Sequence, residues 1–296
     1  MCLDTLFIQQ RPLSHPLFMF MLASMERYSN TVLRTLIYRH GADLTFTEMT
    51  HVQGLLNGNK GSLEKIDAKD ATPVQIQVLS SSINKLDRFL SSFNVFEGFR
   101  GFNLNLSCPS REVINHGKGA AMVKRAAKTQ NLVSLIKDYS FSVSVKIRLG
   151  LNQFEKDNKL YLNNLGSVDP DCFIVHAKHA GQSSNEPEDN SVYPECVEAA
   201  RGIPVVANGG IDSSEKVRML MDQGVDGVMI GRAALSNPLI FDLIKNEMGV
   251  NKPPKTLTGL DELRAEYNDI HSEHQGDTRY LDNFSRIVGK QVDLQY

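Results

Sequence analysis

IPVVANGGIDS (residues 203–213) and DGVMIGRAALSNP (residues 226–238) repeat one pattern, in which an apolar strand runs into glycine and then into a helix. Glycine lets the backbone approach a ligand closely, and the N–H groups at the start of the following helix attract anions. In (β/α)8 barrels, phosphate commonly binds after the seventh and eighth strands. The pair therefore predicts two late barrel strands and a phosphate site. We expect that site at Gly209, Gly210, Gly231 and Arg232.

Six further apolar runs precede these two and alternate with amphipathic, helix-like stretches. The expected strands are residues 18–23, 44–47, 74–79, 102–106, 142–147, 173–176, 205–208 and 227–230. The expected helices are residues 31–40, 82–93, 120–139, 156–165, 192–201 and 214–223. Eight strands with intervening helices favour a closed (β/α)8 TIM barrel, an α/β fold, over an open doubly wound sheet. No G-x-G-x-x-G follows the first strand, so the usual dinucleotide fingerprint is missing.

The βα pattern gives three expected parts: an N-terminal leader at 1–16, a barrel at 17–250 and a short helical C-terminal extension at 251–296. Residues 251–258 (NKPPKTLT) are expected to be a linker. Residues 49–72 and 181–190 are polar excursions that we expect as long loops where the strands end. Loops in that position are more often functional than idle.

The composition excludes several classes of protein. The chain has 296 residues, 41% of them hydrophobic, and a formal net charge of −2, which argues against an overall basic surface for nucleic acid. Its four cysteines have no C-x-x-C spacing, and His271 and His274 are the nearest approach to a metal pair, so we expect no metal. The apolar run at 17–23 is too short to cross a bilayer. The few cysteines fit a reducing compartment, so we expect a cytoplasmic location without membrane attachment.

FNLNLSCPS (residues 102–110) carries the most reactive side chain. The strand is expected to end at Leu106, which places Asn105 and Cys108 where the barrel strands finish. A thiol with an ordinary pKa near 8.5 is mostly protonated at pH 7 and suits proton donation. The alternative is a small buried hydrophobic residue. We assign that alternative to Cys2, Cys172 and Cys196.

Other expected strands end in cationic, histidine or amide side chains. In VSVKIRLG (residues 143–150), Lys146 and Arg148 share one face, because side chains alternate along a strand. Inside a barrel an unpaired charge is costly, so the partner is either an anion such as reduced flavin or phosphate, or a buried carboxylate such as Glu48. His176 and Gln77 end two more strands. Each is either a ligand contact or a core residue whose hydrogen bonds are made within the protein.

Taken together, these segments resemble the tRNA-dihydrouridine synthase family. The resemblance spans roughly residues 22–241 and rests on residues 22–49, on FNLNLSCPSREVINHGKGAAM (residues 102–122), and on VKIRLG, the histidine segment, NGGI and the GR helix in family order. It implies FMN at the carboxyl ends of the barrel strands, with NADPH or NADH as the electron donor that reduces it. It also implies reduction of the C5–C6 bond of a flipped-out uracil in tRNA to dihydrouridine.

The resemblance also assigns roles to residues. Cys108 would protonate uracil C5. The implied substrate contacts are Asn105, Arg148 and Lys178. The implied cofactor contacts are Ala23, Ser24, Met25, Gln77, Lys146, His176, Asn208, Gly209, Gly210, Gly231 and Arg232.

The chain departs from the family at Ser24, Ser107 and Lys178, where proline, glycine and arginine are usual. Its C-terminal segment, residues 251–296, holds six basic and eight acidic residues, a poor electrostatic footprint for RNA. The barrel rim offers Lys118, Lys124, Arg125 and Lys128 instead, or these four form a solvated helix face. Two alternatives remain open: a dihydroorotate dehydrogenase-like FMN enzyme acting on a free pyrimidine, and a binding barrel without activity.

Overall fold

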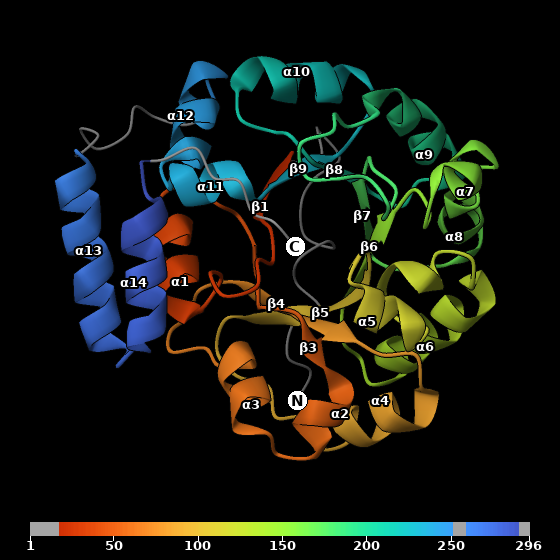
Figure 1. Ribbon diagram of the computed structural model, residues 1–296, viewed down its shortest axis with the longest axis horizontal. Coiled ribbons are helices and arrows are strands. Elements are labelled where there is room, and N and C mark those ends of the chain that lie inside the picture. Colours follow the sequence, from red (N-terminus) through yellow and green to blue (C-terminus); the bar gives the residue numbers. More distant parts are fainter. Residues whose placement is uncertain (1–17, 251–258, 290–296) are drawn as a thin grey trace.

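A computed structural model describes residues 18–250 and 259–289. Within this part, nine parallel strands form one sheet in the order β1-β9-β8-β7-β6-β5-β4-β2, and β3 also pairs with β4. The two ends of this order meet where Met21 bridges Leu44, so eight strands close into a barrel (Figure 1). The strands are β1 (Met19–Leu22), β2 (Thr45–Phe46), β3 (Thr50–His51), β4 (Val74–Leu79), β5 (Phe99–Leu106), β6 (Val143–Arg148), β7 (Cys172–His176), β8 (Val205–Asn208) and β9 (Gly227–Ile230).

Helices surround this barrel, as Figure 1 shows. The arrangement confirms the predicted α/β fold, a (β/α)8 TIM barrel with a helical C-terminal region. The helices are α1 (Thr31–Arg39), α2 (Val52–Leu56), α3 (Lys60–Ile66), α4 (Ile83–Leu90), α5 (Arg111–Asn115), α6 (Ala126–Asp138), α7 (Gln153–Asp157), α8 (Tyr161–Ser167), α9 (Tyr193–Ala199), α10 (Ser214–Asp222), α11 (Arg232–Ser236), α12 (Ile240–Glu247), α13 (Leu260–Glu273) and α14 (Thr278–Ile287).

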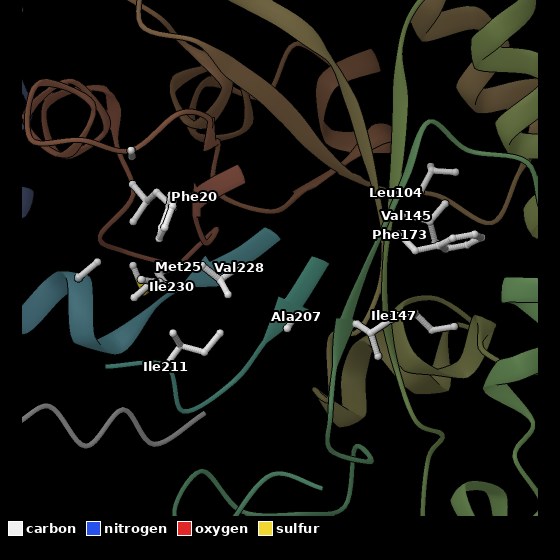
Figure 2. Packing of buried hydrophobic residues seen from close by; sticks show 14 of the residues in the cluster. Phe20, Met25, Leu104, Val145, Ile147, Phe173, Ala207, Ile211, Val228 and Ile230 are labelled. Atoms are coloured by element: carbon white, nitrogen blue, oxygen red, sulfur yellow. The ribbon is translucent and has the colours of Figure 1, made fainter. Parts of the chain in front are cut away.

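The outward-facing strand residues form the main core. Leu104 of β5, Val145 of β6 and Phe173 of β7 occupy paired positions and lie side by side beneath the helices (Figure 2). Each is at most 1% exposed. Burial of one such side chain contributes roughly 1.5–3 kcal/mol. Because strand side chains alternate, the intervening residues point into the barrel.

The barrel interior is divided between apolar and polar side chains. An apolar cluster fills one part of it, built mainly from β1, β2, β7, β8 and β9. Its buried members are Met21, Ala23, Leu44, Phe46, Ile174, Val206 and Met229. On β4, β5 and β6 the inward positions are polar, and they lead to the end of the barrel where the strands finish. We call that end the mouth.

Residues 49–72 differ from the expected long loop, because they contain β3, α2 and α3. The buried side chains of Val52 and Leu55 give α2 an apolar face. Asn59 caps α3 by accepting from Ser62 N–H at 3.0 Å. The polar composition of residues 49–72 predicts a loop and reveals neither helix.

Two expected helices are interrupted. The helix predicted over 120–139 is wrong at its start, because Gly119–Met122 form a separate 3₁₀ helix and α6 begins at Ala126. Ala120 N–H donates to Cys108 C=O at 3.1 Å, so this turn belongs to the Cys108 loop. The helix predicted over 156–165 is also wrong. Lys159 has φ +52°, a value that an α-helix cannot hold, and it separates α7 from α8.

The helical C-terminal region lies against α1 (Figure 1). The rings of Tyr267 in α13 and Phe284 in α14 stack with centroids 3.8 Å apart. His40, which ends α1, places Nε2 2.8 Å from Glu266 Oε2. The boundaries of the three expected parts stay a prediction, and residues 1–16 and 251–258, including Cys2, lie outside the described residues.

Candidate active site

Strand register gathers the predicted site residues at the mouth. Asn105 pairs with Lys146 across β5 and β6, and Arg148 pairs with His176 across β6 and β7. His176 in turn pairs with Asn208 on β8. Paired residues on adjacent strands point to the same face. Side chains from four neighbouring strands therefore form two adjacent inward-facing rows, one with Asn105 and Lys146 and the next with Arg148, His176 and Asn208.

A chain of amide hydrogen bonds from β4 and β5 supports the row that contains Asn105. Asn105 Nδ2 donates to Gln77 Oε1 at 2.7 Å, and Gln77 Nε2 donates to Asn103 Oδ1 at 2.8 Å. Asn103 Nδ2 continues the chain to Ser144 Oγ at 2.7 Å. All four residues are buried. A buried amide without partners would be costly, so this network holds the side chains in fixed orientations.

Cys108 lies in a turn that three neighbours hold. Asn105 Oδ1 accepts from Ser107 N–H at 2.9 Å and from Cys108 N–H at 2.8 Å. Arg148 Nε donates to Ser107 C=O at 2.8 Å. On the other side, Gly119 lies so close that an added Cβ would come within 2.8 Å of Cys108 C=O. The thiol position is therefore defined by backbone contacts.

Burial raises the pKa of the Cys108 thiol above its ordinary value, and this outweighs the opposing effects of a hydrogen bond from the Ser110 backbone and the charge of Arg148. Cys108 is half-buried. It therefore stays protonated at neutral pH and can act as an acid.

The mouth is electropositive. Lys146 Nζ donates to Asn208 Oδ1 at 2.7 Å, and burial, reinforced by the charge of Arg148, lowers the pKa of Lys146 to about 7. Burial also lowers the pKa of His176, with further contributions from Arg148 and Lys146, so its imidazole is neutral at pH 7. Within the described residues no carboxylate forms an ion pair with Lys146; Glu48, the carboxylate considered from the sequence, lies 3.9 Å from Lys65 Nζ. An anionic ligand would be stabilised here.

The predicted phosphate site starts at Gly209 and Gly210, which we call the glycine turn. Both residues have positive φ, +119° and +55°. The side chain of Glu188 lies over this turn, because a Cβ at Gly210 would fall 2.4 Å from Glu188 Oε2. Glu188 Oε1 lies 3.2 Å from Lys178 Nζ. Lys178 is only 2% exposed and also donates to Ser184 C=O at 3.0 Å, so its substrate role stays a prediction.

The other predicted cofactor residues lie across the mouth. Ala23 N–H donates to Ile230 C=O at 2.8 Å, which fixes the end of β1 beside the end of β9. A Cβ on Gly231 would lie 3.5 Å from both Ala23 Cβ and Met25 Sδ. Ser24 lies between these two residues in the chain, and Arg232 begins α11 directly after Gly231. The structure thus brings both glycine segments to one end of the barrel.

Four residues of the site were missed from the sequence: Asn103, Gly119, Glu188 and Tyr193. Asn103 precedes Asn105 by two positions in FNLNL, so strand alternation could have found it. The Tyr193 hydroxyl accepts from Asn208 N–H at 3.1 Å and fixes the end of β8. No local signal separates Glu188 from the nearby Glu186 in the polar excursion.

The described residues hold neither a metal cluster nor a membrane-spanning helix. Across 18–250 and 259–289, no group of three or more histidine, cysteine or acidic side chains is arranged to hold a metal ion. In the same part of the chain, no helix combines the length and apolar character needed to cross a membrane.

The chain is similar to known proteins over most of its length. A family model described as dihydrouridine synthase (Dus) matches residues 21–291. The chain belongs to the dihydrouridine synthase family. The predicted family resemblance is therefore confirmed, and with it the assignment to flavin-dependent oxidoreductases.

Curated relatives of this dihydrouridine synthase family member carry the same description. A tRNA-dihydrouridine synthase B of Xanthomonas campestris pv. campestris is 29% identical, covering 85% of this chain and 77% of that relative. A probable tRNA-dihydrouridine synthase of Helicobacter pylori is 29% identical over 84% of this chain and 78% of its own length. A probable tRNA-dihydrouridine synthase of Aquifex aeolicus is 28% identical over 77% and 73%, respectively.

Proposed function

We propose that this protein reduces uridine to 5,6-dihydrouridine in tRNA, with FMN as cofactor, NADPH or NADH as electron donor and Cys108 as proton donor. One observation carries the proposal: a protonated thiol lies at a barrel mouth beside the buried amine of Lys146, which forms no ion pair with a carboxylate among the described residues. That combination suits a reaction in which an anionic ring lies beside a proton donor. Its family relatives named as tRNA-dihydrouridine synthases support the choice of substrate. A cytoplasmic location, where tRNA is found, is part of the proposal.

The residues at the mouth fit FMN. Lys146 provides a cation for an anionic ring, Gln77 and neutral His176 provide hydrogen-bonding groups, and Ala23–Met25 with Gly231 provide a wall of small or flexible side chains. The glycine turn already faces a carboxylate, so its geometry accommodates anionic oxygens. Reduced FMN, when bound, supplies the hydride that adds to uracil C6.

The remaining chemistry belongs to this chain. As C6 accepts the hydride, negative charge develops on the uracil, and the Cys108 S–H gives its proton to C5. The C5–C6 double bond becomes a single bond with one new hydrogen on each carbon, and the thiolate regains a proton from solvent. Arg148 fixes the Cys108 turn through Ser107 and contributes positive charge that stabilises the transient thiolate.

Contacts with tRNA are proposed for the barrel rim. Lys118 directly precedes Gly119, which packs on Cys108, and Arg125 directly precedes α6 on the same side of the site. Lys128 is the further basic residue of this rim, whereas Lys124 is paired with Glu155 at 3.2 Å. Phosphate contacts of this kind supply most of the affinity for nucleic acid.

The test uses purified protein, FMN, NADPH and tRNA that lacks modifications. We expect bound flavin to be released as FMN on denaturation, and nucleoside analysis to show dihydrouridine. Cys108→Ala should retain FMN and lose at least a hundredfold in turnover, since general acids contribute about 10²–10⁴-fold. The matched control is Cys172→Ala, which removes a thiol at the start of β7, away from the mouth.

Full turnover by Cys108→Ala would refute the proton-donor role. Protein that takes up no flavin would refute the proposal as a whole. Rapid reoxidation of the reduced protein by free orotate, with no reaction on tRNA, would instead favour an enzyme of free pyrimidines.

A further inference from the structure

The glycine turn is covered by a carboxylate from the protein itself. Glu188 lies on the segment between β7 and α9, and its side chain is 11% exposed. A Cβ at Gly209 would fall 2.6 Å from Glu188 Cγ, and a Cβ at Gly210 would fall 2.4 Å from Glu188 Oε2. The side chain therefore lies directly on both glycines.

Lys178 holds this carboxylate. Its Nζ lies 3.2 Å from Glu188 Oε1, and the lysine side chain is 3% exposed. The same ammonium donates to Ser183 C=O at 3.3 Å and to Ser184 C=O at 3.0 Å, which closes the segment over the turn. The pKa of His176 is lowered mainly by burial, and the charge of Lys178 adds to this effect after those of Arg148 and Lys146.

A second anion cannot share this position. Two like charges a few ångströms apart repel, and the Glu188 side chain already fills the space directly over both glycines. A flavin phosphate seated on the glycine turn therefore requires the Glu188 carboxylate to leave. The segment leaves room for this movement of the Glu188 side chain. Glu186 and Pro187, which precede Glu188, are exposed, whereas Asp189 after it is held by a hydrogen bond from its N–H to Ala177 C=O at 2.9 Å.

We propose that Glu188 is an internal competitor for the phosphate position. Its carboxylate occupies the glycine turn until a phosphate displaces it, and Lys178 then changes partner from carboxylate to phosphate. This inference rests on the proposed use of FMN. It makes Glu188 a residue that sets the affinity for phosphorylated flavin without contacting the reacting atoms.

The experiment compares two flavins that differ only in the phosphate. Flavin-free protein is titrated with FMN and with riboflavin, and the quenching of flavin fluorescence gives each dissociation constant. Glu188→Gln keeps the shape and removes the charge. We expect it to bind FMN at least tenfold more tightly, about 1.4 kcal/mol, and riboflavin within twofold of the wild-type value.

Two further variants make the result specific. Glu188→Ala removes the side chain altogether and should also tighten FMN selectively. Glu186→Gln makes the same charge change two positions earlier, on an exposed side chain whose contact is Ser183 N–H at 2.8 Å, and should leave both affinities unchanged.

The outcomes are distinct. If wild-type protein binds FMN and neither Glu188 variant binds it more tightly, the inference is wrong while the proposed cofactor stands. An equal gain for riboflavin and FMN would also overturn it, because the gain would not involve the phosphate. Failure of every variant to bind either flavin would overturn the proposed function, and this inference with it.

Discussion

Gly119 packs directly against Cys108, so Gly119→Ala tests how far the thiol position depends on this contact. Gly119 has φ +55°, and its missing Cβ would lie 2.8 Å from both Cys108 C=O and Val113 Cγ1 and 3.0 Å from Cys108 Cβ. The left-handed backbone costs a non-glycine residue about 1–2 kcal/mol. Overpacking against a backbone oxygen and a buried methyl adds about 1–3 kcal/mol. We therefore expect a loss of about 2–5 kcal/mol in the free energy of unfolding.

Gly58→Ala is the matched control. Gly58 has a similar φ of +63°, but no atom lies within 4 Å of its added Cβ. This variant should lose only the backbone part, about 1–2 kcal/mol. The difference between the two variants, measured by urea denaturation, isolates the contact with the Cys108 loop.

The same substitution should reduce catalysis. Relief of the contact moves the Cys108 backbone, and a shift of about 1 Å at a reacting group can cost on the order of a hundredfold in rate. We expect Gly119→Ala to retain FMN and to reduce uridine at least tenfold more slowly than Gly58→Ala. Equal stability and equal turnover in the two variants would refute the reasoning.

Two other predictions follow from buried groups. Folding lowers the pKa of Lys146 from 10.5 to about 7, so the unfolded chain binds more protons between these values and the contribution of Lys146 to stability rises with pH. Flavin-free Lys146→Met should therefore exceed the wild type in stability by roughly 2–4 kcal/mol at pH 7, with the gap narrowing toward pH 10 in urea denaturation, and a gap independent of pH would contradict this. Phe284→Ala removes a ring that is 6% exposed and stacked on Tyr267, and should cost about 3–5 kcal/mol by thermal unfolding while FMN binding persists. Loss of FMN binding together with stability would show that α14 supports the mouth directly.

Strand alternation made much of the site predictable. Lys146, Arg148 and His176 follow from where each strand ends and from the two-residue period, both local properties of the sequence. Their gathering at one mouth then follows from the parallel topology. Asn103 was available to the same reasoning, since it shares a face with Asn105.

The rest depends on contacts between distant segments. Glu188 reaches the glycine turn through the path of an irregular segment, and α2 forms within residues 49–72 because Val52 and Leu55 cover an apolar surface. Nothing near Gly119 in the sequence reveals that Cys108 lies against it. Packing of this kind is decided by tertiary structure and has no local period.

The pairing of β1 with β9 has a consequence for how the protein is made. Met19 pairs with Gly227, and Leu22 pairs with Ile230. The first described strand to be synthesised therefore cannot form these pairs until the last strand of the barrel has been made. Contacts this far apart in the chain slow folding and leave strand edges exposed during synthesis. Ala23–Met25 and Gly231 meet at that same seam. If the proposed function holds, the cofactor pocket is assembled only when the ring closes, and we expect a nascent chain to retain flavin only once its barrel is complete.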